Sequence, residues 1–406
     1  MLKLAEVAEK ILTVGKGALL SKFDIARAYR NVPICPADSH LLGMHWNGKY
    51  YIDLTLPFGL RSSCTIFNSV GDLISAILNK DCTYSEIEHY LDDFITVGNI
   101  RLHDADRNIL KEFKEILRIC EELGIKLADD KTVWPTTRLI FLGFLLDTIS
   151  LTIQIPEQKL TAYRFEVAKA SSSRSIRKKH LDSLLGKLLH AAFVIPIGRA
   201  FLRTLINKNA ATKRRFAWIS LSVEDRSNLK WWLTLFDNWN GITLMRFRNW
   251  APAPDLELSS DAALKEGFGI VCGDNWVSGT WPADAPKNIA VLELIPIVLA
   301  AMLWGNHWTG KCILFHTDSM AAHCSAESLL SRDPHLASLI RELAIISIEQ
   351  NLHFQTKHLP GKQYVAADLL SRNRHAEFFK IRPTAMRKPF CENVDSLVDR
   401  LISLRN

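Results

Sequence analysis

The chain has 406 residues, 48% hydrophobic and 23% charged, which is the composition of a globular protein with two or three domains. No stretch reaches the ~18 uncharged apolar residues of a membrane span, since the best candidate, residues 139–155, contains Asp147. The N-terminal segment carries Glu6 and Glu9 and lacks a signal-peptide layout, so an intracellular location, cytoplasmic or nuclear, is expected. The eight cysteines form no CxxC pair, which favours reduced thiols over disulfides or a zinc site.

The net charge of +7 is distributed unevenly. Residues 1–150 hold 17 basic and 20 acidic side chains, a net of −3. Residues 151–250 hold 18 and 6, a net of +12, and residues 251–406 hold 15 and 17, a net of −2. A basic block of this size indicates a polyanionic partner, although a solvated helical face has the same composition.

In chain order, the first block mixes short strands with helices. Strands are predicted at 22–25 and 50–54, and helices at 63–78 and 107–123. Residues 90–97 contain two apolar runs interrupted by two acids, which predicts a hairpin with the acids near its turn.

The second block is helical in pattern, notably at 179–190 and 223–237, and its basic clusters at 171–180 and 207–215 are predicted to be exposed loops or helix ends. Prolines within 249–255 mark a boundary. Three strands then precede alternating helices and strands, a mixed α/β layout. The predicted elements are 256–262, 268–272, 276–281, 289–304, 312–317, 352–358 and 365–371.

A first group of acids lies in the first block. Asp24 follows a short apolar strand, and Asp92 and Asp93 lie between two β-prone runs. Adjacent carboxylates in an apolar strand pair repel each other and lose solvation, and divalent cations offset both costs. Two Mg²⁺ ions ~3.5–4 Å apart can hold the attacking and leaving oxygens of phosphoryl transfer. An exposed hairpin turn is the alternative for an Asp-Asp pair alone.

The neighbouring residues give a specific resemblance. FDIARAY, LPFGLRSSCTIF and YLDD, followed by LGIKLADDKT and FLGF, are similar in order and spacing to the palm motifs of reverse transcriptases from gypsy-type and DIRS-type retrotransposons. The resemblance covers residues 5–245. It implies that Asp24 and Asp92, with Asp93 beside them, bind two Mg²⁺ or Mn²⁺ ions.

The same resemblance implies a nucleotide site. Tyr29 matches the aromatic gate against the 2′-hydroxyl, and Phe58 and Gly59 match the segment under the incoming nucleotide. Arg61 would contact phosphate or template, and Lys131 would assist pyrophosphate release. A core aromatic and a surface lysine are the alternatives for Tyr29 and Lys131.

Two departures from the family pattern stand out. Cys64-Thr65 replaces the usual Ala-Pro of the second motif. Only 23 residues precede Asp24, so the fingers region with its triphosphate-binding residues is expected to be missing, as in a fragment, a truncated gene model or a decayed copy.

Residues 151–250 match the family's thumb and connection in position. Their basic side chains are expected to contact phosphates without reading sequence. These nucleic-acid-binding candidates are Arg174, Arg177, Lys178, Lys179, Lys213, Arg214 and Arg215. Trp231 and Trp232 are predicted to be core residues rather than base-stacking platforms.

A second group of acids lies in the third block. Asp261 ends its first strand, Glu293 lies in an otherwise apolar helix, Asp318 ends a later strand and Asp368 lies near the end. Acids at strand ends and on helices can converge at one sheet edge and build a second two-metal site, here for hydrolysis. Unrelated structural or surface acids are the alternative.

HTDSMAA and PGKQYVAADLLSR resemble the ribonuclease H of the same retroelements, over residues 255–373. The resemblance implies that these four acids are the catalytic ones. Tyr364 stands where the family often has Asn, and His358 is interpreted as assisting product release or proton transfer, or as a plain strand histidine.

The predicted fold class is an α+β palm-type polymerase domain, a helical thumb/connection and an α/β ribonuclease H-like domain. Their bounds are 1–150, 151–250 and 251–375, with a tail at 376–406 whose amphipathic helix is a candidate start of a further domain. The expected partners are an RNA template, a DNA primer, an RNA–DNA hybrid and deoxynucleoside triphosphates. The alternatives are a domesticated or decayed nucleic-acid-binding chain, or a nuclease whose palm remnant binds the hybrid.

Overall fold

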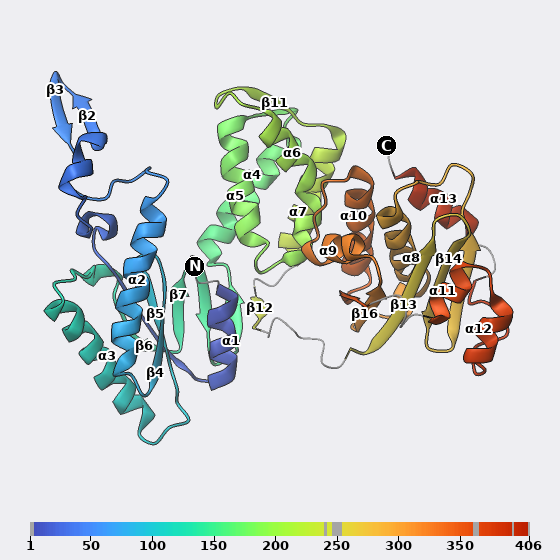
Figure 1. Cartoon of the computed structure of the whole chain (residues 1–406), viewed down its shortest axis with the longest axis horizontal. Coiled ribbons are helices and arrows are strands. Elements are labelled where there is room, and N and C mark those ends of the chain that lie inside the picture. Colours follow the sequence, from blue (N-terminus) through green and yellow to red (C-terminus); the bar gives the residue numbers. More distant parts are fainter. Residues whose placement is uncertain (1–3, 239–241, 246–253, 360–364, 392–393, 405–406) are drawn as a thin grey trace. The chain divides into compact units, whose positions relative to one another are not determined.

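The computed structural model divides the chain into two compact units, each with its own core (Figure 1). Unit 1 comprises residues 1–160 and 241–248, and unit 2 comprises residues 161–240 and 249–406. The structure describes residues 4–238, 242–245, 254–359, 365–391 and 394–404. Tyr364 and most of the proline-marked boundary at 249–255 lie outside these ranges.

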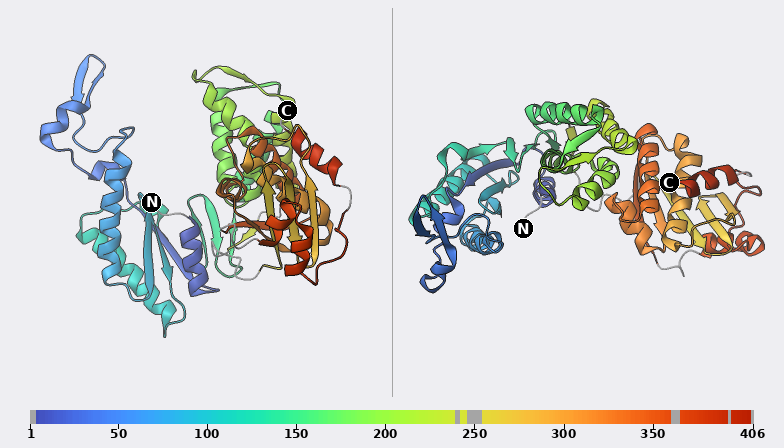
Figure 2. Two further views of the ribbon diagram at one scale, coloured as in Figure 1. Left: turned by 45° about the vertical axis from the view of Figure 1, so that its right-hand side comes forward. Right: turned by 90° about the horizontal axis from the view of Figure 1, so that it is seen from above.

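Unit 1 is built on two four-stranded sheets, with strand orders β4-β5-β1-β6 and β12-β9-β8-β7. The hairpin β2–β3 projects from the rest of unit 1, as Figure 1 and the left view of Figure 2 show, and is exposed along its whole length. The helices and strands are α1 (Leu4–Val14), β1 (Leu19–Asp24), β2 (Gly43–Trp46), β3 (Lys49–Ile52), α2 (Ser63–Lys80), β4 (Ser85–Tyr90), β5 (Asp93–Gly98), α3 (Ala105–Glu122), β6 (Val133–Thr136), β7 (Arg138–Phe141), β8 (Phe144–Asp147), β9 (Thr152–Gln154) and β12 (Ile242–Leu244).

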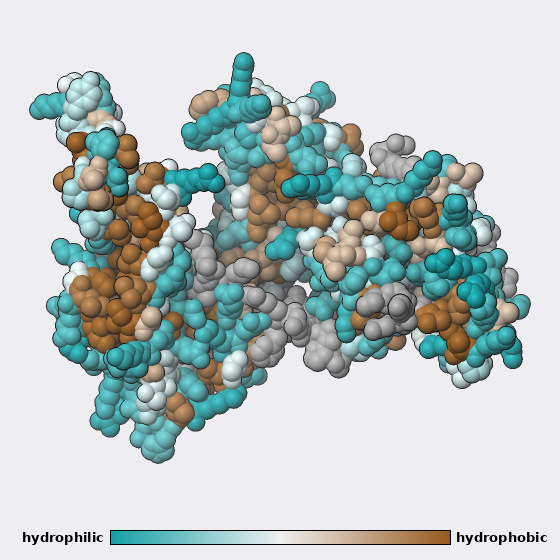
Figure 3. All heavy atoms as spheres, viewed as in Figure 1, coloured by the Kyte–Doolittle hydropathy of each residue, from teal (hydrophilic) through white to brown (hydrophobic). Residues whose placement is uncertain are grey.

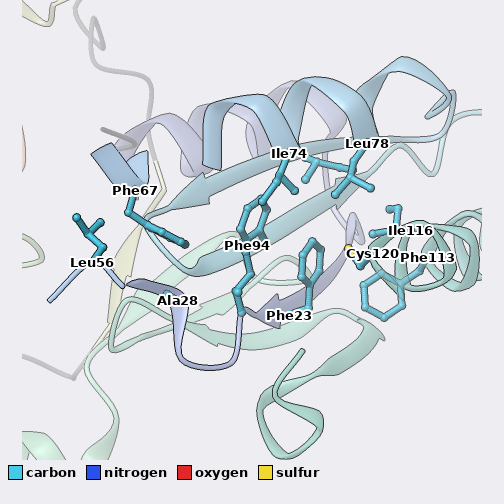
Figure 4. Close-up of a cluster of buried hydrophobic side chains, with 12 residues drawn as sticks. Phe23, Ala28, Leu56, Phe67, Ile74, Leu78, Phe94, Phe113, Ile116 and Cys120 are labelled. Carbon is cyan, nitrogen blue, oxygen red and sulfur yellow. The ribbon is translucent and has the colours of Figure 1, made fainter. Parts of the chain in front are cut away.

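Helices α2 and α3 cover one face of the first sheet (Figure 4). Phe23 and Phe94 are direct partners on β1 and β5, and their rings stack at 4.8 Å. Because side chains alternate along a strand, the next pair, Asp24 and Asp93, projects to the opposite face. The acids therefore stand on the sheet face away from α2 and α3.

Unit 2 contains a five-stranded sheet with strand order β15-β14-β13-β16-β17. The first three strands are antiparallel, and β16 and β17 run parallel to β13. Helices α8, α10 and α13 pack against one another, and α11 packs on β13 and β14. The elements of this part are β13 (Leu256–Ala263), β14 (Gly267–Cys272), β15 (Asn275–Thr280), α8 (Ile289–Trp304), β16 (Cys312–Thr317), α9 (Met320–Ser328), α10 (Pro334–Glu349), β17 (His353–His358), α11 (Val365–Ser371), α12 (His375–Ile381) and α13 (Asp395–Ser403).

The helical part of unit 2 precedes this sheet in the chain. It consists of α4 (Glu157–Ser172), whose first four residues belong to unit 1, and of β10 (Ser175–Arg177), α5 (Lys178–Ala191), α6 (Arg203–Ala211), β11 (Trp218–Ser220) and α7 (Val223–Asn238). Trp232 is fully buried, and Trp231 stacks on Phe201 at 5.6 Å, which confirms both tryptophans as packing residues.

Helix α8 with the turn after it, Ile289–His307, is the one described helix long and apolar enough to cross a membrane. Of this segment, 78% is buried inside unit 2, as a central core helix would be. The expectation that 139–155 is the best candidate for a membrane span was wrong, because Ile289–His307 meets the length and composition required and 139–155 form the short strands β7 to β9.

Two predictions on organisation differ from the structure. The boundary expected at residue 150 falls inside the second sheet, because β9 pairs with both β8 and β12 and joins 151–160 to unit 1. The middle block is not separate either, since α10 packs on the turn at 196–201 and Arg341 ion-pairs with Glu224. The C-terminal helix α13 buries Val398, Leu401 and Ile402 within the same unit.

Candidate metal centres and nucleotide site

The three acids of unit 1 meet at the end of one strand pair. Asp24 is the last residue of β1 and faces Asp93, the first residue of β5. The predicted β4–β5 hairpin is present, with Asp92 in its turn. Leu91 in that turn has a φ of +56°, a conformation that costs free energy and often marks functional sites. The backbone amide of Ile25 donates to Asp92 O at 3.1 Å, which fixes the turn beside β1.

The electrostatics at this site favour a cation. Burial, then the neighbouring charge of Asp24, raises the pKa of Asp93 to about 6. Burial and Asp24 also raise the pKa of Asp92. Lys131 supplies one positive charge, since its Nζ donates to Asp24 Oδ2 at 3.0 Å, and this contact raises the pKa of Lys131. The segment carrying Lys131 is held in place by Ala128 N, which donates to Asp24 O at 2.9 Å.

The expected nucleotide residues lie near one another in unit 1. The Tyr29 ring meets Phe58 at 4.9 Å and Phe67 at 5.4 Å, both edge-on. Gly59 has a φ of +92°, which only glycine adopts without strain, and Phe58 is exposed beside it. Arg61 is exposed. The hydroxyl of Tyr29 lies 3.1 Å from Cys64 Sγ, and this hydrogen bond raises the pKa of Tyr29 to about 12.

In unit 2, three of the four predicted acids converge. The carboxylate oxygens of Asp261, Glu293 and Asp318 lie within 4.8 Å of one another, and no other such group of three occurs in the described part of the chain. Asp261 lies in β13 rather than at its end, because the strand continues to Ala263. Asp318 directly follows β16, which runs parallel to β13, and Glu293 comes from the apolar helix α8. We call these residues the acidic triad.

Among the described residues, no basic side chain forms an ion pair with the acidic triad. Glu293 Oε1 accepts from the amide of Ala262 at 3.2 Å, whereas the buried Oε2 has no hydrogen-bond partner among the described residues. Burial, then the charges of Asp261 and Asp318, raises the pKa of Glu293 to about 9. The pKa of Asp261 is raised as well, mainly by burial. An orphaned carboxylate oxygen among three acids fits a divalent cation, whose preferred ligands are such oxygens.

Asp368 stands next to the acidic triad rather than inside it. It lies on α11 and ion-pairs with Arg372, one helical turn later, at 2.7 Å. Its charge acts on Asp261, whose side chain also accepts a hydrogen bond from Ser371. The close approach of α11 to the sheet depends on Gly269, because a Cβ there would lie 2.5 Å from Ala367 O.

His358 ends β17 beside the acidic triad. Its Nε2 lies 3.0 Å from the backbone oxygen of Asp318, and it is the strand partner of Thr317. This contact places His358 where it can orient the Asp318 segment. No contact of His358 among the described residues tests its expected role in product release or proton transfer.

Six of the seven basic candidates are solvent-facing, and Lys178 is not. Lys178 Nζ donates to Asn209 O at 2.9 Å and Asn209 Oδ1 at 3.1 Å, and its side chain is only 15% exposed. Lys178 therefore anchors local structure instead of contacting phosphate. The other candidates are exposed: Arg174, Arg177, Lys179, Lys213, Arg214 and Arg215.

The sequence reasoning missed three contact residues. Ser371 and Arg372 follow Asp368 by three and four positions, the spacing at which helical side chains meet, so this signal was available. Cys64 was identified only as a departure from the family pattern. Its contact with Tyr29 could not be predicted, because the two residues are 35 positions apart and no sequence pattern links them.

Part of unit 1 matches a known family model. Residues 3–146 match the family model "Reverse transcriptase (RNA-dependent DNA polymerase)". The chain is 23% identical over 318 residues to Protein P of Heron hepatitis B virus, covering 76% of this chain and 36% of that protein. It is 23% identical over 379 residues to the Enzymatic polyprotein of Carnation etched ring virus, covering 90% and 53%. Over 137 residues it is 22% identical to the retrovirus-related Pol polyprotein from transposon gypsy of Drosophila melanogaster, covering 34% and 12%.

Among solved structures, the foamy viral protease-reverse transcriptase in complex with RNA/DNA hybrid is similar at 17% identity and a TM-score of 0.46, covering 86% of this chain and 46% of that one. The chain spans about a third of the heron virus protein and about half of the carnation virus protein. Residues 3–146 therefore match a reverse transcriptase model, and the chain is similar to viral and retrotransposon polyproteins.

Proposed function

We propose that this chain is an RNA-directed DNA polymerase with ribonuclease H activity from a retroelement of the gypsy or DIRS type. It would copy an RNA template from a DNA primer and cleave the RNA strand of the resulting hybrid. The family match over 3–146 supports the polymerase half. The observation that carries the nuclease half is the acidic triad, which brings three acids from separate elements to one edge of the sheet. The proposed location is intracellular, cytoplasmic or nuclear.

The five-stranded sheet supports a ribonuclease H-like domain. Three antiparallel strands followed by two parallel ones, with an apolar helix after the third, is the layout that the sequence resemblance implies. The 379-residue similarity to the carnation virus polyprotein also extends well beyond the reverse transcriptase domain. Both points favour a second catalytic domain over an accidental cluster of acids.

Each acid group is proposed to bind two Mg²⁺ or Mn²⁺ ions. When bound, these ions would polarise the attacking hydroxyl or water and neutralise the charge of the leaving oxygen. In unit 1, Asp24, Asp92 and Asp93 would hold the ions, and Lys131 would give a proton to the departing pyrophosphate. In unit 2, the acidic triad and Asp368 would hold them, and Glu293 would lose its proton on binding.

The nucleotide site of unit 1 supplies selectivity in this proposal. The Tyr29 ring, fixed between Phe58 and Phe67, would exclude the 2′-hydroxyl of ribonucleotides by contact alone. Phe58 and Gly59 would lie under the base, and Arg61 would contact phosphate or template.

Two assays on the full chain test the halves separately: primer extension on an RNA template, and cleavage of an RNA–DNA hybrid, each with Mg²⁺. Asp92→Asn should abolish extension and spare cleavage, and Asp318→Asn should do the reverse, so each variant is the control for the other. Asp284→Asn removes an exposed acid of unit 2 outside the acidic triad and should change neither activity. Cleavage that survives Asp318→Asn would refute the nuclease assignment, and extension that survives Asp92→Asn would refute the polymerase assignment.

A second candidate is a hybrid-cleaving nuclease whose reverse transcriptase domain only binds nucleic acid. One observation favours it. The acids of unit 2 form a compact group without a counterion, whereas those of unit 1 do not form such a group and share Lys131. Cleavage without extension by the unmodified chain would support this candidate.

A further inference from the structure

The two basic clusters of the middle block, distant in sequence, lie side by side in unit 2. Strands β10 and β11 pair, with Ile176 opposite Ile219 and Arg177 opposite Trp218. The pairing continues on both sides, since Leu221 N donates to Arg174 O at 2.9 Å and Lys179 N donates to Arg215 O at 3.1 Å. We call residues 174–179 and 213–221 the basic ribbon.

The two faces of the basic ribbon differ in character. Ile219 is buried and Ile176 half-buried, so this face is attached to the rest of unit 2. Arg177 and Trp218, one position along, point the other way and are exposed. The ribbon is a two-stranded sheet of its own among the described elements, with no further strand on either edge.

The exposed face combines flat rings with guanidinium groups. Trp218 is 63% exposed, and the Arg177 guanidinium lies over its ring at 5.2 Å. Phe216, in the turn before β11, is 67% exposed, with the Arg215 guanidinium 5.8 Å from its ring centre. Two exposed rings with guanidinium groups beside them form a surface on which flat ligands can stack. In Figure 3, hydrophilic side chains project around β11 at the top of the molecule.

The positive charge of the ribbon is not neutralised internally. Within the described residues, none of its six exposed basic side chains has a carboxylate within 4.0 Å. The nearby Asp182 carboxylate accepts a hydrogen bond from Asn209 Nδ2 at 2.7 Å and forms an ion pair with Lys178 Nζ at 3.4 Å. The ribbon therefore presents six exposed cations without an ion pair among the described residues, which suits it to bind a polyanion.

We propose that the basic ribbon binds single-stranded nucleic acid, with bases stacked on Trp218 and Phe216 and phosphates on the surrounding cations. A track of cations with exposed rings is the combination that single-strand binding uses, because every base has a flat face and every linkage a charge. A duplex hides its base faces, so the rings would add little to duplex binding. The site shares no residue with either acid group, so it can be tested apart from both proposed activities.

The test measures binding of the full chain by fluorescence anisotropy, in a chelator so that no cleavage occurs. The probes are a labelled oligo(dT) strand and a labelled DNA hairpin duplex with the same number of phosphates. Trp218→Ala should weaken oligo(dT) binding about tenfold, the usual effect of losing one stacked base, and leave duplex binding unchanged. Trp218→Phe keeps a ring and should restore most of the affinity.

Two further variants separate the contribution of positive charge to binding from that of an exposed aromatic ring. Arg177→Gln should lower the slope of log affinity against log salt by about 0.7 for the single strand, the value for one lost phosphate contact. Phe165→Ala, which removes a similarly exposed ring from α4, is the matched control and should change nothing. All these side chains are exposed, and unchanged thermal unfolding of the variants would confirm intact folds.

Three results would overturn the proposal. The first is oligo(dT) binding that Trp218→Ala and Phe216→Ala leave unchanged. The second is an equal loss of single-strand and duplex binding, which would reduce the ribbon to a plain phosphate contact. The third is ribbon-dependent binding of phosphatidylserine vesicles without any effect on oligo(dT), which would assign the surface to an acidic membrane.

Discussion

The proton on Glu293 provides a quantitative test of the acidic triad. Burial and the charges of Asp261 and Asp318 raise its pKa from 4.5 to about 9. From about pH 5.5 to about pH 7.5, the metal-free folded protein therefore keeps a proton that the unfolded chain has lost. The native state binds more protons, so the free energy of unfolding falls as pH rises, by about 1.4 kcal/mol per pH unit and about 3 kcal/mol across this window.

Glu293→Gln should remove this pH dependence. Glutamine mimics the protonated acid in shape and cannot ionise, so the variant's stability lacks the contribution of this group. Asp261 and Asp318 remain in both proteins, so the difference between wild type and variant isolates Glu293. We expect the wild type to lose about 3 kcal/mol relative to Glu293→Gln between about pH 5.5 and about pH 7.5.

Amide hydrogen exchange of peptides from α8, in a chelator, is a suitable measurement. Nearly every residue of α8 is buried, so its amides exchange through opening of the unit rather than local fraying. Comparing the two proteins at each pH cancels the intrinsic pH dependence of exchange. Adding Mg²⁺ should stabilise the wild type more at the higher pH, because binding displaces the proton. Parallel pH profiles for the two proteins would refute a protonated, buried Glu293.

Three further predictions concern other parts of the chain. Lys131→Met removes the ammonium 3.0 Å from Asp24 and should slow primer extension about 100-fold; cleavage of the RNA–DNA hybrid is the control, and unchanged extension would contradict the role assigned to Lys131. Gly198→Ala would put a Cβ 2.4 Å from the Trp232 ring, and urea unfolding should show a loss of about 1–3 kcal/mol. Tyr29→Val should raise ribonucleotide incorporation relative to deoxynucleotide by about tenfold in extension assays; an unchanged ratio would count against a gate.

The elements with strong local signals were predicted well from sequence. Helix α8 has the expected bounds because the Asn288 side chain caps it by accepting a hydrogen bond from Ala290 N and a run that is apolar except for Glu293 follows. A hairpin with the acids near its turn was also predicted, although its first strand, β4, lies at Ser85–Tyr90, largely before the predicted range 90–97. Asp261, Glu293 and Asp318 came together as expected, because strand ends and a buried acid are visible in the sequence.

What the sequence did not predict depends on contacts between distant residues. Strands β10 and β11 have three residues each and pair across about forty positions, so neither shows a periodic pattern. The basic clusters were therefore expected to be exposed loops or helix ends, and the sequence does not predict the contact of Arg177 with Trp218. The sequence does not distinguish Lys178 from the neighbouring basic residues, because its ammonium donates to Asn209, which is 31 positions away.

The two acid groups also differ in how their charge is balanced, and this has a consequence for metal binding. In unit 1, Lys131 already donates to Asp24, so part of the negative charge is compensated before any ion binds. In unit 2, Arg372 ion-pairs with Asp368 rather than with the triad, and Glu293, with its raised pKa, holds a proton instead. A cation entering unit 2 must displace that proton, whereas one entering unit 1 must share Asp24 with a lysine. Metal affinity should therefore depend more steeply on pH in unit 2 than in unit 1.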